Sequence, residues 1–342
     1  MPMPLTLLRK LQSATPSDAW ASLFEHAWHI CSAPLNAEKA SSEVTKRDAE
    51  VGAADLFLAT AGWDLWRSFE TVVPRTADAL ASWWGSHGSR SSGGRAVLVL
   101  DALSLREVPW LIEGAGQRGY TVHQARATGA ELPADTTPFA QALGFASRSS
   151  IQNNGGAGKG RLSGASTDST ALPWDDCAAQ ITASQDWLLW HHWPDERLHD
   201  LSVPGHGLAA LAREAAEKLR SDAFWTLVHS LTTGRRLVIT ADHGYAASGH
   251  FPDTADSAQA QYLKDRFKSG RWSAVADLEQ PAPGAWVPPL DMQLKTTHVD
   301  AAFALGRRKW KSQGGYPTLT HGGLSLLEVA VPFVELSRTG GA

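Results

Sequence analysis

The sequence is poor in cysteine and has no long apolar run, and both shortages exclude classes of protein. Two cysteines, Cys31 and Cys177, are too few for a disulfide framework, and neither belongs to a C-x-x-C pair. No apolar run approaches the roughly 18 residues of a membrane-spanning helix. The opening MPMPLTLLRKLQ is too short for a secretory signal. We therefore expect a soluble protein of the reducing cytoplasm, without membrane contact.

The chain also lacks an excess of charge of either sign. Its 31 lysines and arginines nearly balance 35 aspartates and glutamates, which leaves a formal net charge of -4. This balance argues against a generally basic surface for nucleic acid, but not against a local basic pocket. Hydrophobic residues make up 43% of the 342 residues, as in an ordinary globular protein.

The first 90 residues are expected to be mainly helical and carry no chemical motif. Apolar residues recur at helical spacing in residues 17–30, and residues 76–84 form a second predicted helix. Residues 86–94 are rich in glycine and serine and predict a loop. We therefore assign residues 1–90 to a helical N-terminal region whose role the sequence does not reveal.

A different pattern follows, in which short apolar runs alternate with helical stretches. Such runs suit strands that are buried on both faces of a parallel sheet. The predicted strands are residues 96–100, 120–123, 187–190, 236–240 and 327–336. The predicted helices are residues 105–116 and 208–232, and the low-complexity stretch is 152–170, which we expect to be flexible. The alternation predicts an α/β fold with a doubly wound, mostly parallel sheet.

Two of the predicted strands end directly before residues that can bind metals. Asp101 follows the run AVLVL, and Asp242 and His243 come just after the run RLVIT. Ligands of open α/β sheets bind beyond the carboxyl ends of the strands, so these three side chains should meet at one edge. Carboxylate oxygen and imidazole nitrogen are suitable zinc ligands, although each residue alone would be an ordinary turn or cap residue.

Further histidines and an aspartate extend this candidate site. Asp195 and His199 lie four residues apart and would share one face of a helix, where both could bind one ion. An exposed polar turn is the alternative interpretation of this segment, and His206 is a nearby alternative to His199. His321 stands beside two glycines, which allow a close backbone approach around it.

A hydroxyl group at a predicted helix start supplies a candidate nucleophile. Thr137 is followed by Pro138, an arrangement typical of a helix N-cap. Backbone N–H groups at a helix start favour a bound phosphate, and a metal-bound hydroxyl ionises more readily. Thr136 is the alternative nucleophile, and a plain N-cap is the alternative role of Thr137.

Taken in order, these segments resemble a known family. The series VLVLDALS, DTTPFAQALGF, DxxxH, ITADHGYAASG and HGGLSLLEVAVPFVEL is similar to the PglZ domain of the alkaline phosphatase superfamily. The resemblance covers residues 95–338, which we assign to a catalytic domain of alkaline phosphatase-like fold. PglZ proteins are similar to components of bacterial antiphage defence systems of the BREX type, so the resemblance implies other defence proteins as partners.

The resemblance also implies two divalent metal ions, usually zinc and sometimes manganese. Carried onto this sequence, one ion would be held by Asp101, Thr137, Asp242 and His243. The other would be held by Asp195, His199 and His321. Thr137 would attack phosphorus and form a threonyl-phosphate, which water then hydrolyses.

The positions that would bind the phosphate oxygens are less well defined. The candidates are Gln141, His250, Lys295 and Arg307, with His298 as a further one. For each of them an ordinary surface or structural role is the alternative and the favoured interpretation. Family members often carry arginine at the position of Gln141, so this departure puts the strength of catalysis in doubt.

The implied activity is hydrolysis of a phosphate ester, first of all a phosphodiester in a nucleotide or nucleic acid. One alternative is a metal-binding scaffolding subunit of a defence complex with weak or lost catalysis. Another is a phosphomonoesterase or phosphomutase. The sequence leaves these alternatives open because substrate choice depends on loops that follow no periodic pattern.

Overall fold

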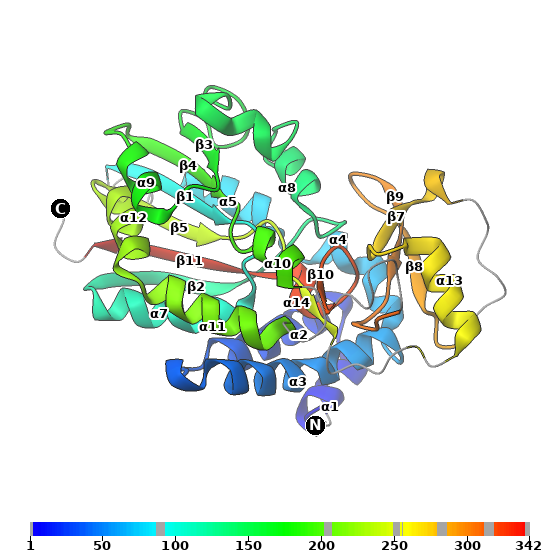
Figure 1. Ribbon diagram of the computed structural model, residues 1–342. Coiled ribbons are helices and arrows are strands. Elements are labelled where there is room, and N and C mark those ends of the chain that lie inside the picture. The colour runs from blue at the N-terminus through cyan, green and yellow to red at the C-terminus, as the bar shows by residue number, and fades with distance from the viewer. Residues whose placement is uncertain are drawn as a thin grey trace.

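The computed structural model describes residues 3–86, 93–201, 207–248, 254, 256–278, 286–310 and 318–338. Helices flank a central sheet, and a smaller sheet stands to one side (Figure 1). The architecture is mixed α/β with a mostly parallel central sheet, which confirms the predicted fold class. Among the helices of these residues, none is long and apolar enough to span a membrane.

The central sheet has six strands in the order β2, β11, β5, β1, β4 and β3. Their bounds are Gly94–Leu100 for β1, Tyr120–Gly129 for β2, Ser166–Thr170 for β3, Asp186–His191 for β4, Arg235–Thr240 for β5 and Ala330–Arg338 for β11. β1 is parallel to β4 and β5, and β3 is parallel to β4, whereas β11 runs antiparallel to β2 and β5. The carboxyl ends of β1, β4 and β5 therefore lie at one edge of the sheet.

Both faces of this sheet are covered by helices. Alternate side chains of a strand point to opposite faces, so each face has a buried cluster of its own. Leu98 and Leu100 of β1 belong to one buried cluster, and Val97 and Val99 belong to another. The first cluster includes residues of α7 (Val108–Gln117), α9 (Trp174–Gln180), α11 (Gly207–Arg220) and α12 (Asp222–Thr232). The second includes residues of α5 (Thr76–Gly85) and α8 (Thr136–Ala142).

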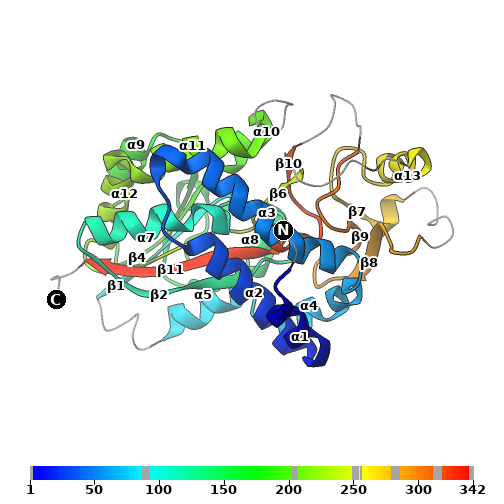
Figure 2. The same ribbon diagram turned by 90° about the horizontal axis from the view of Figure 1, so that it is seen from below.

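The N-terminal helices share the first of these clusters. They are α1 (Leu5–Ser13), α2 (Pro16–Ser32), α3 (Ala40–Ala59) and α4 (Phe69–Val72). Trp20 of α2 and Val51 of α3 are buried in the cluster that also contains Leu98 of β1. Figure 2 shows α2 and α3 lying across the sheet near β11 and α7. The N-terminal region is thus mainly helical, as predicted, and packs on the sheet through a common core.

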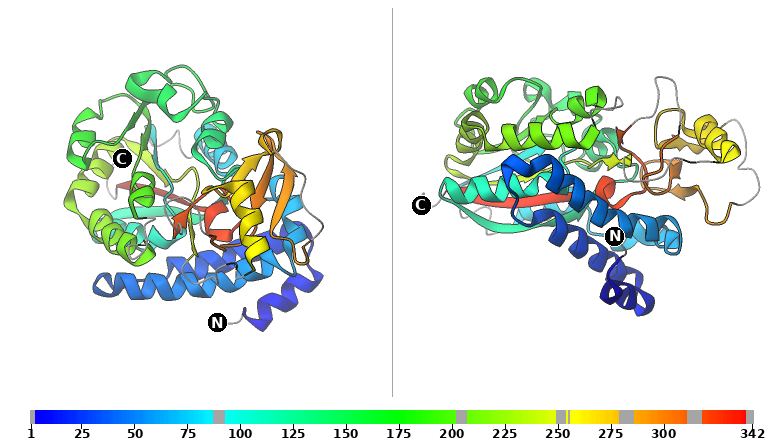
Figure 3. Two further views of the ribbon diagram at one scale, coloured as in Figure 1. Left: turned by 45° about the vertical axis from the view of Figure 1, so that its right-hand side comes forward. Right: turned by 60° about the horizontal axis from the view of Figure 1, so that its bottom comes forward.

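The smaller sheet stands apart from the central one, on the right-hand side of Figure 1 and in both views of Figure 3. Its strand order is β7 (Trp272–Ala274), β9 (Asp300–Ala304) and β8 (Asp291–Lys295), all antiparallel, and α13 (Ser257–Phe267) packs on it. In the chain, this unit lies between β5 and β11. The predicted ligands Asp242 and His243 come just after β5, and His321 comes before β11. Trp272 of β7 donates from Nε1 to Asp135 Oδ2 at 3.1 Å, so the small sheet contacts the segment before α8.

The remaining elements are short. They are α10 (Asp195–Leu201), α14 (Leu326–Val329), β6 (Ala246–Ala247) and β10 (Leu319–Thr320), with 3-10 turns at η1 (Ala37–Lys39), η2 (Trp63–Ser68), η3 (Leu105–Glu107), η4 (Arg148–Asn154) and η6 (Val275–Asp277). Several of them carry or support the side chains of the site described below.

The structure corrects three expectations about secondary structure. The strand predicted at 327–336 begins only at Ala330, since Leu326–Val329 form the short helix α14. The single helix predicted at 208–232 is two helices, because Ser221 caps a new start and its hydroxyl accepts a hydrogen bond from the N–H of Phe224. The stretch 152–170, predicted to be flexible, contains strand β3. The hydroxyl of Thr167 donates to the carbonyl of Ile151 and accepts from the N–H of Gly156, and these side-chain bonds order the segment.

Candidate metal centre

The ends of β1 and β5 bring Asp101, Asp242 and His243 together, as predicted. The two strands are adjacent and parallel, and all three side chains are fully buried. Asp242 accepts hydrogen bonds through Oδ1 from the N–H groups of Ala102 and His243, at 2.9 and 3.0 Å. These bonds fix the carboxylate and leave its Oδ2 directed at the imidazole, 3.5 Å from His243 Nε2.

The ring of His243 is oriented by its own backbone neighbourhood. Its Nδ1 lies 2.9 Å from the carbonyl oxygen of Gly244 and must donate to it, which leaves Nε2 for another partner. That Nε2 lies 3.6 Å from Asp101 Oδ1. Burial acts to lower the pKa of His243, but the carboxylates of Asp242 and Asp101 raise it to about 9. The cluster therefore attracts positive charge strongly.

A second group of ligands lies next to the first. Asp195 begins α10, and its N–H donates to the carbonyl of Asp101 at 3.1 Å, which ties the two groups together. Its Oδ2 lies 3.5 Å from His199 Nε2, and its Oδ1 lies 3.6 Å from His321 Nε2. Although burial acts to raise it, the pKa of Asp195 is held below its usual range by the hydrogen bond to His199 and the charge of His321. The rings of His321 and His243 stack with centroids 4.3 Å apart.

These residues fit divalent cations. In each of the triads Asp101–Asp242–His243 and Asp195–His199–His321, one ligand atom per residue lies within 4.8 Å of the others. Among the described residues, four buried polar atoms of the two triads find no hydrogen-bond partner: Asp195 Oδ1, Asp242 Oδ2, His243 Nε2 and His321 Nδ1. Unpaired buried polar atoms are costly, and carboxylate and imidazole are the ligands that zinc prefers.

Asp135 is a fourth carboxylate at this site, which the sequence analysis missed. It forms a further possible ligand triad with His243 and His321. Its Oδ1 accepts from the N–H of Thr136 at 2.8 Å, and its Oδ2 accepts from Trp272 Nε1, in the small sheet, at 3.1 Å. The available signal was its place just before a helix start, where aspartate is a preferred cap.

The two threonines of the candidate nucleophile differ in position. Asp135, not Thr137, is the N-cap of α8, so the predicted N-cap role of Thr137 is wrong. Thr136 is half-buried and its Oγ1 lies 3.5 Å from Asp101 Oδ1, whereas Thr137 is exposed. Asp135 takes the cap because its carboxylate can reach the N–H of Thr136, and this turns the hydroxyl of Thr136 toward the cluster.

Asp101 has two further partners on its other oxygen. Its Oδ2 accepts a hydrogen bond from Trp190 Nε1 at 3.1 Å and forms an ion pair with the guanidinium of Arg148. Burial and the nearby Asp242 raise the pKa of Asp101 well above its ordinary value. Arg148 was not singled out in the sequence, because it lies in the loop after α8, where no periodic pattern marks it.

The other predicted residues lie elsewhere or outside the described residues. Gln141 and Lys295 are exposed, and His298 lies 3.5 Å from Glu131. His250 and the alternative ligand His206 fall outside the described residues. Arg307, a candidate for phosphate binding, is fully buried and pairs with Asp48 and Asp55, which fits the structural role that was its alternative.

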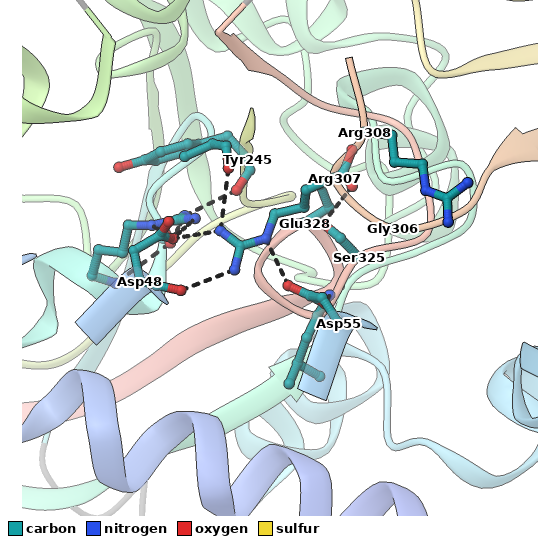
Figure 4. A network of polar contacts seen from close by, with 12 residues as sticks. Asp48, Asp55, Tyr245, Gly306, Arg307, Arg308, Ser325 and Glu328 are labelled. Atoms are coloured by element: carbon teal, nitrogen blue, oxygen red, sulfur yellow. Dashed lines mark hydrogen bonds and ion pairs between the residues drawn. The ribbon is translucent and has the colours of Figure 1, made fainter. Parts of the chain in front are cut away.

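A buried polar network supports the loops that carry the ligands (Figure 4). Asp48 of α3 accepts from Arg106 and from Arg307, and Arg106 also donates to the carbonyl of Tyr245 at 2.9 Å. Tyr245 follows the segment that carries Asp242 and His243. Helix α3 therefore helps to fix this ligand loop through two arginines.

A second arm of the network reaches the loop of His321. Glu328 accepts from Arg271 at 2.7 Å and from the N–H of Gly323 at 2.8 Å, and its own carbonyl accepts from the N–H of Gly244 at 2.8 Å. Within the motif HGGLSLLE, the second glycine, Gly323, is thus held by the glutamate of the same motif. Both histidine-bearing loops are tied to one buried carboxylate residue.

Comparison with known proteins places this geometry in a family. Residues 165–336 match the BREX system PglZ alkaline phosphatase-like domain. Among curated protein sequences, no match was found.

Among solved structures, an inactive form of murine ectonucleotide pyrophosphatase/phosphodiesterase 5 in complex with AMP is similar at 14% identity and a TM-score of 0.46, covering 71% of this chain and 87% of that chain. The human ectonucleotide pyrophosphatase/phosphodiesterase 5 is similar at 13% identity and a TM-score of 0.44, covering 71% and 87%.

The family match includes five of the predicted ligands, namely Asp195, His199, Asp242, His243 and His321. It spans half of the 342 residues. The chain belongs to the PglZ family of alkaline phosphatase-like domains.

Proposed function

We propose that this protein is a metal-dependent hydrolase of phosphate esters, acting on a phosphodiester of a nucleotide or nucleic acid, with Thr136 as the nucleophile. The observation that carries the proposal is the convergence of two ligand triads beside the hydroxyl group of Thr136. Within the described residues, four buried polar atoms of these triads make no hydrogen bond. Membership of the alkaline phosphatase-like PglZ family supports the same reaction class.

Two divalent cations, zinc or manganese, would complete the site. Asp101, Asp242 and His243 would hold one, and Asp195, His199 and His321 would hold the other. When bound, such ions lower the pKa of a nearby hydroxyl and offset the charge of a phosphoryl group. Asp135 is a further carboxylate within reach of His243 and His321.

Residues of the chain itself orient the hydroxyl of Thr136 and the ring of His243. Asp101 Oδ1 lies 3.5 Å from Thr136 Oγ1 and keeps the hydroxyl directed into the cluster. Asp135 fixes the backbone of Thr136 through its N–H. The carbonyl of Gly244 holds His243 with Nε2 facing the two carboxylates. A nucleophile held in one orientation avoids an entropic cost at the moment of attack.

The covalent chemistry has two steps. The oxygen of Thr136 forms a bond to phosphorus while the bond from phosphorus to the leaving alkoxide breaks, and the alcohol departs after taking up a proton. In the second step, water oxygen forms a bond to phosphorus and the bond to Thr136 breaks. One proton of that water returns to the Thr136 oxygen and restores the hydroxyl, and the product is a phosphomonoester. Covalent catalysis of this kind divides one difficult displacement into two.

The test is a direct assay of the purified full chain. Bound zinc and manganese are counted by elemental analysis, and cleavage of bis-(p-nitrophenyl) phosphate is compared with cleavage of the monoester. We expect metal-dependent diester cleavage that Thr136→Ala and Asp242→Ala abolish. A preference for the monoester would instead identify a phosphomonoesterase.

Two other results would change the proposal itself. Two bound metals without turnover of either substrate would support the alternative of a metal-binding scaffold. Folded protein that binds no metal would contradict the proposed site.

We further propose that the protein acts in bacterial cytoplasm together with other proteins of an antiphage defence system. The description of the family as a domain of the BREX system supports this role. Deletion of the gene from a strain that carries the system should then raise phage plating efficiency, and unchanged plating would contradict the role in defence.

A further inference from the structure

Arg148 is held in a defined position beside the candidate centre. It begins the 3-10 turn η4 (Arg148–Asn154), and Ser147 and Ser150 form a reciprocal cap at that start. From there its guanidinium forms an ion pair with Asp101 Oδ2. The side chain of Arg148 is 26% exposed while that of Asp101 is fully buried, so the arginine lies at the boundary between the centre and solvent.

Most of the hydrogen-bonding capacity of this guanidinium is unused. An arginine has five N–H donors. Within the described residues, the structure gives Arg148 one side-chain hydrogen bond, from Nη1 to Asp101. Arg106 and Arg307, by contrast, are buried and bonded to Asp48. Arg148 therefore retains donors and solvent access at the site.

Arg148 and Thr136 converge on the same carboxylate. Thr136 Oγ1 approaches Asp101 Oδ1, and Arg148 approaches Asp101 Oδ2. The two oxygens of one carboxylate lie roughly 2.2 Å apart by ordinary covalent geometry. A phosphoryl group on the oxygen of Thr136 would consequently lie within reach of the guanidinium.

A phosphoryl group needs donors of this kind. Negative charge accumulates on its non-bridging oxygens, and a planar guanidinium can donate to two such oxygens at once. Gln141, which stands where family members often carry arginine, is exposed and cannot be assigned this task from its position. The site thus has an arginine with the right chemistry, from a different part of the chain.

We propose that Arg148 is a catalytic residue that binds the non-bridging oxygens of the phosphoryl group transferred to Thr136. This inference rests on the proposed function and adds to it the residue that recognises the phosphate. The ion pair with Asp101 holds the guanidinium ready at the mouth of the site until phosphate binds. Asp101 thereby orients both the hydroxyl of Thr136 and the guanidinium of Arg148, which donates hydrogen bonds to the phosphate.

The experiment measures phosphate binding separately from turnover. Inorganic phosphate is titrated into zinc-loaded protein by calorimetry, and zinc content and diester cleavage are measured on the same samples. The variants are Arg148→Ala and Arg148→Lys. Arg161→Ala is the matched control, because Arg161 is another half-exposed arginine, paired with Asp78 at 2.7 Å.

We expect Arg148→Ala to weaken phosphate binding by about 10- to 100-fold, the range for a lost charge-assisted hydrogen bond. It should lower kcat/KM by about 100-fold or more while zinc content stays at the wild-type value. Arg148→Lys should recover part of both losses, because lysine keeps the charge without the planar fork. Arg161→Ala should behave like the wild type.

The outcomes that overturn the inference are distinct from those that overturn the proposed function. Equal phosphate binding by the wild type and Arg148→Ala would remove Arg148 from phosphate recognition while leaving the hydrolase proposal intact. Loss of zinc from Arg148→Ala would show that Arg148 acts by supporting Asp101 and not by contacting phosphate. Zinc-loaded wild type that neither binds phosphate nor cleaves an ester would overturn both proposals.

Discussion

Arg307 donates from Nη1 to Asp48 Oδ1 at 2.7 Å, a contact between residues 259 positions apart in the chain (Figure 4). Both side chains are fully buried. Arg307 also pairs through Nε with Asp55 Oδ2 at 2.7 Å, and Asp55 lies on the same helix α3, further toward its C-terminal end. The N-terminal helix α3 and the C-terminal part of the chain are therefore joined by charges with no access to solvent, next to the loops that carry the metal ligands.

Removal of Asp48 should destabilise the whole protein. Asp48→Ala would leave the guanidinium groups of Arg106 and Arg307 buried without their shared carboxylate, and breaking a buried pair costs about 3–5 kcal/mol. We expect a loss of this size in the free energy of unfolding, measured by urea denaturation. The control is Glu25→Ala, which removes the exposed pair of Glu25 with Lys10 and should cost less than about 1 kcal/mol. Equal losses in the two variants would contradict the role of the network.

The two threonines give a sharp prediction about the nucleophile. Thr136→Ala should lower diester cleavage by roughly 10³-fold or more, as removal of a nucleophile does. Thr137→Ala should stay within about twofold of the wild type, because exposed substitutions change free energies by about 0.5 kcal/mol. Thr136→Ser, which keeps a hydroxyl group, should retain measurable cleavage. The reverse ranking of the two alanine variants would restore Thr137 as the nucleophile.

Zinc should stabilise the folded protein by binding to the two triads. A ligand that binds only the native state adds about 2.7 kcal/mol to stability at a concentration 100 times its Kd. We expect added zinc to raise the midpoint of thermal unfolding and a chelator to lower it. His321→Ala should lose part of this shift. A zinc-induced shift of the same size in His321→Ala would contradict the second triad.

Five of the six metal ligands found from the sequence lie at regular elements, whereas His321 lies in a loop. Asp101, Asp242 and His243 come just after continuous apolar runs. These runs predict the buried strands, and the strand ends determine where the three side chains lie. Asp195 and His199 have helical spacing, and the structure places them on one short helix, α10. Their positions in one cluster were predicted because they depend on regular elements, whereas their role as metal ligands stays a prediction.

The residues that were missed depend on irregular segments. Asp135 and Arg148 reach the cluster from loops on either side of α8, and no periodicity encodes the path of a loop. Arg307 was a candidate for phosphate binding, with a structural role as the alternative, and its partners Asp48 and Asp55 lie on α3, far away in the sequence. Such a pairing depends on how the N-terminal helices pack against the sheet, which a single sequence does not contain.

Gly244 should tolerate no side chain. A Cβ atom at Gly244 would collide with the carbonyl oxygen of Leu327, and the N–H of Gly244 is bonded to the carbonyl of Glu328. Gly244→Ala should therefore displace the loop that orients His243 and weaken zinc binding, at a cost of about 1–3 kcal/mol in stability. Gly116→Ala is the control, because a Cβ there meets no atom of the described part of the chain within 4 Å. Equal zinc affinity in both variants would contradict the fit of this loop.

His191 should make stability depend on pH in the acidic range. Its Nε2 donates to the carbonyl of Leu172 at 2.9 Å and its Nδ1 accepts from the N–H of Trp193 at 3.0 Å, so the folded state requires the neutral ring. Burial lowers the pKa of His191 to about 4. The unfolded chain, with a pKa near 6.5, therefore binds the proton first as the pH falls.

Between pH 6.5 and 4, the unfolded state thus holds more protons at this position, and stability falls as the pH falls. The contribution is fully present above pH 6.5 and amounts to at most about 3 kcal/mol. Urea unfolding at pH 7.5 and pH 5 should show a smaller difference for His191→Gln than for the wild type. His229→Gln, at an exposed histidine, should keep the wild-type difference. The same pH dependence in His191→Gln and the wild type would mean that His191 is not kept neutral by folding.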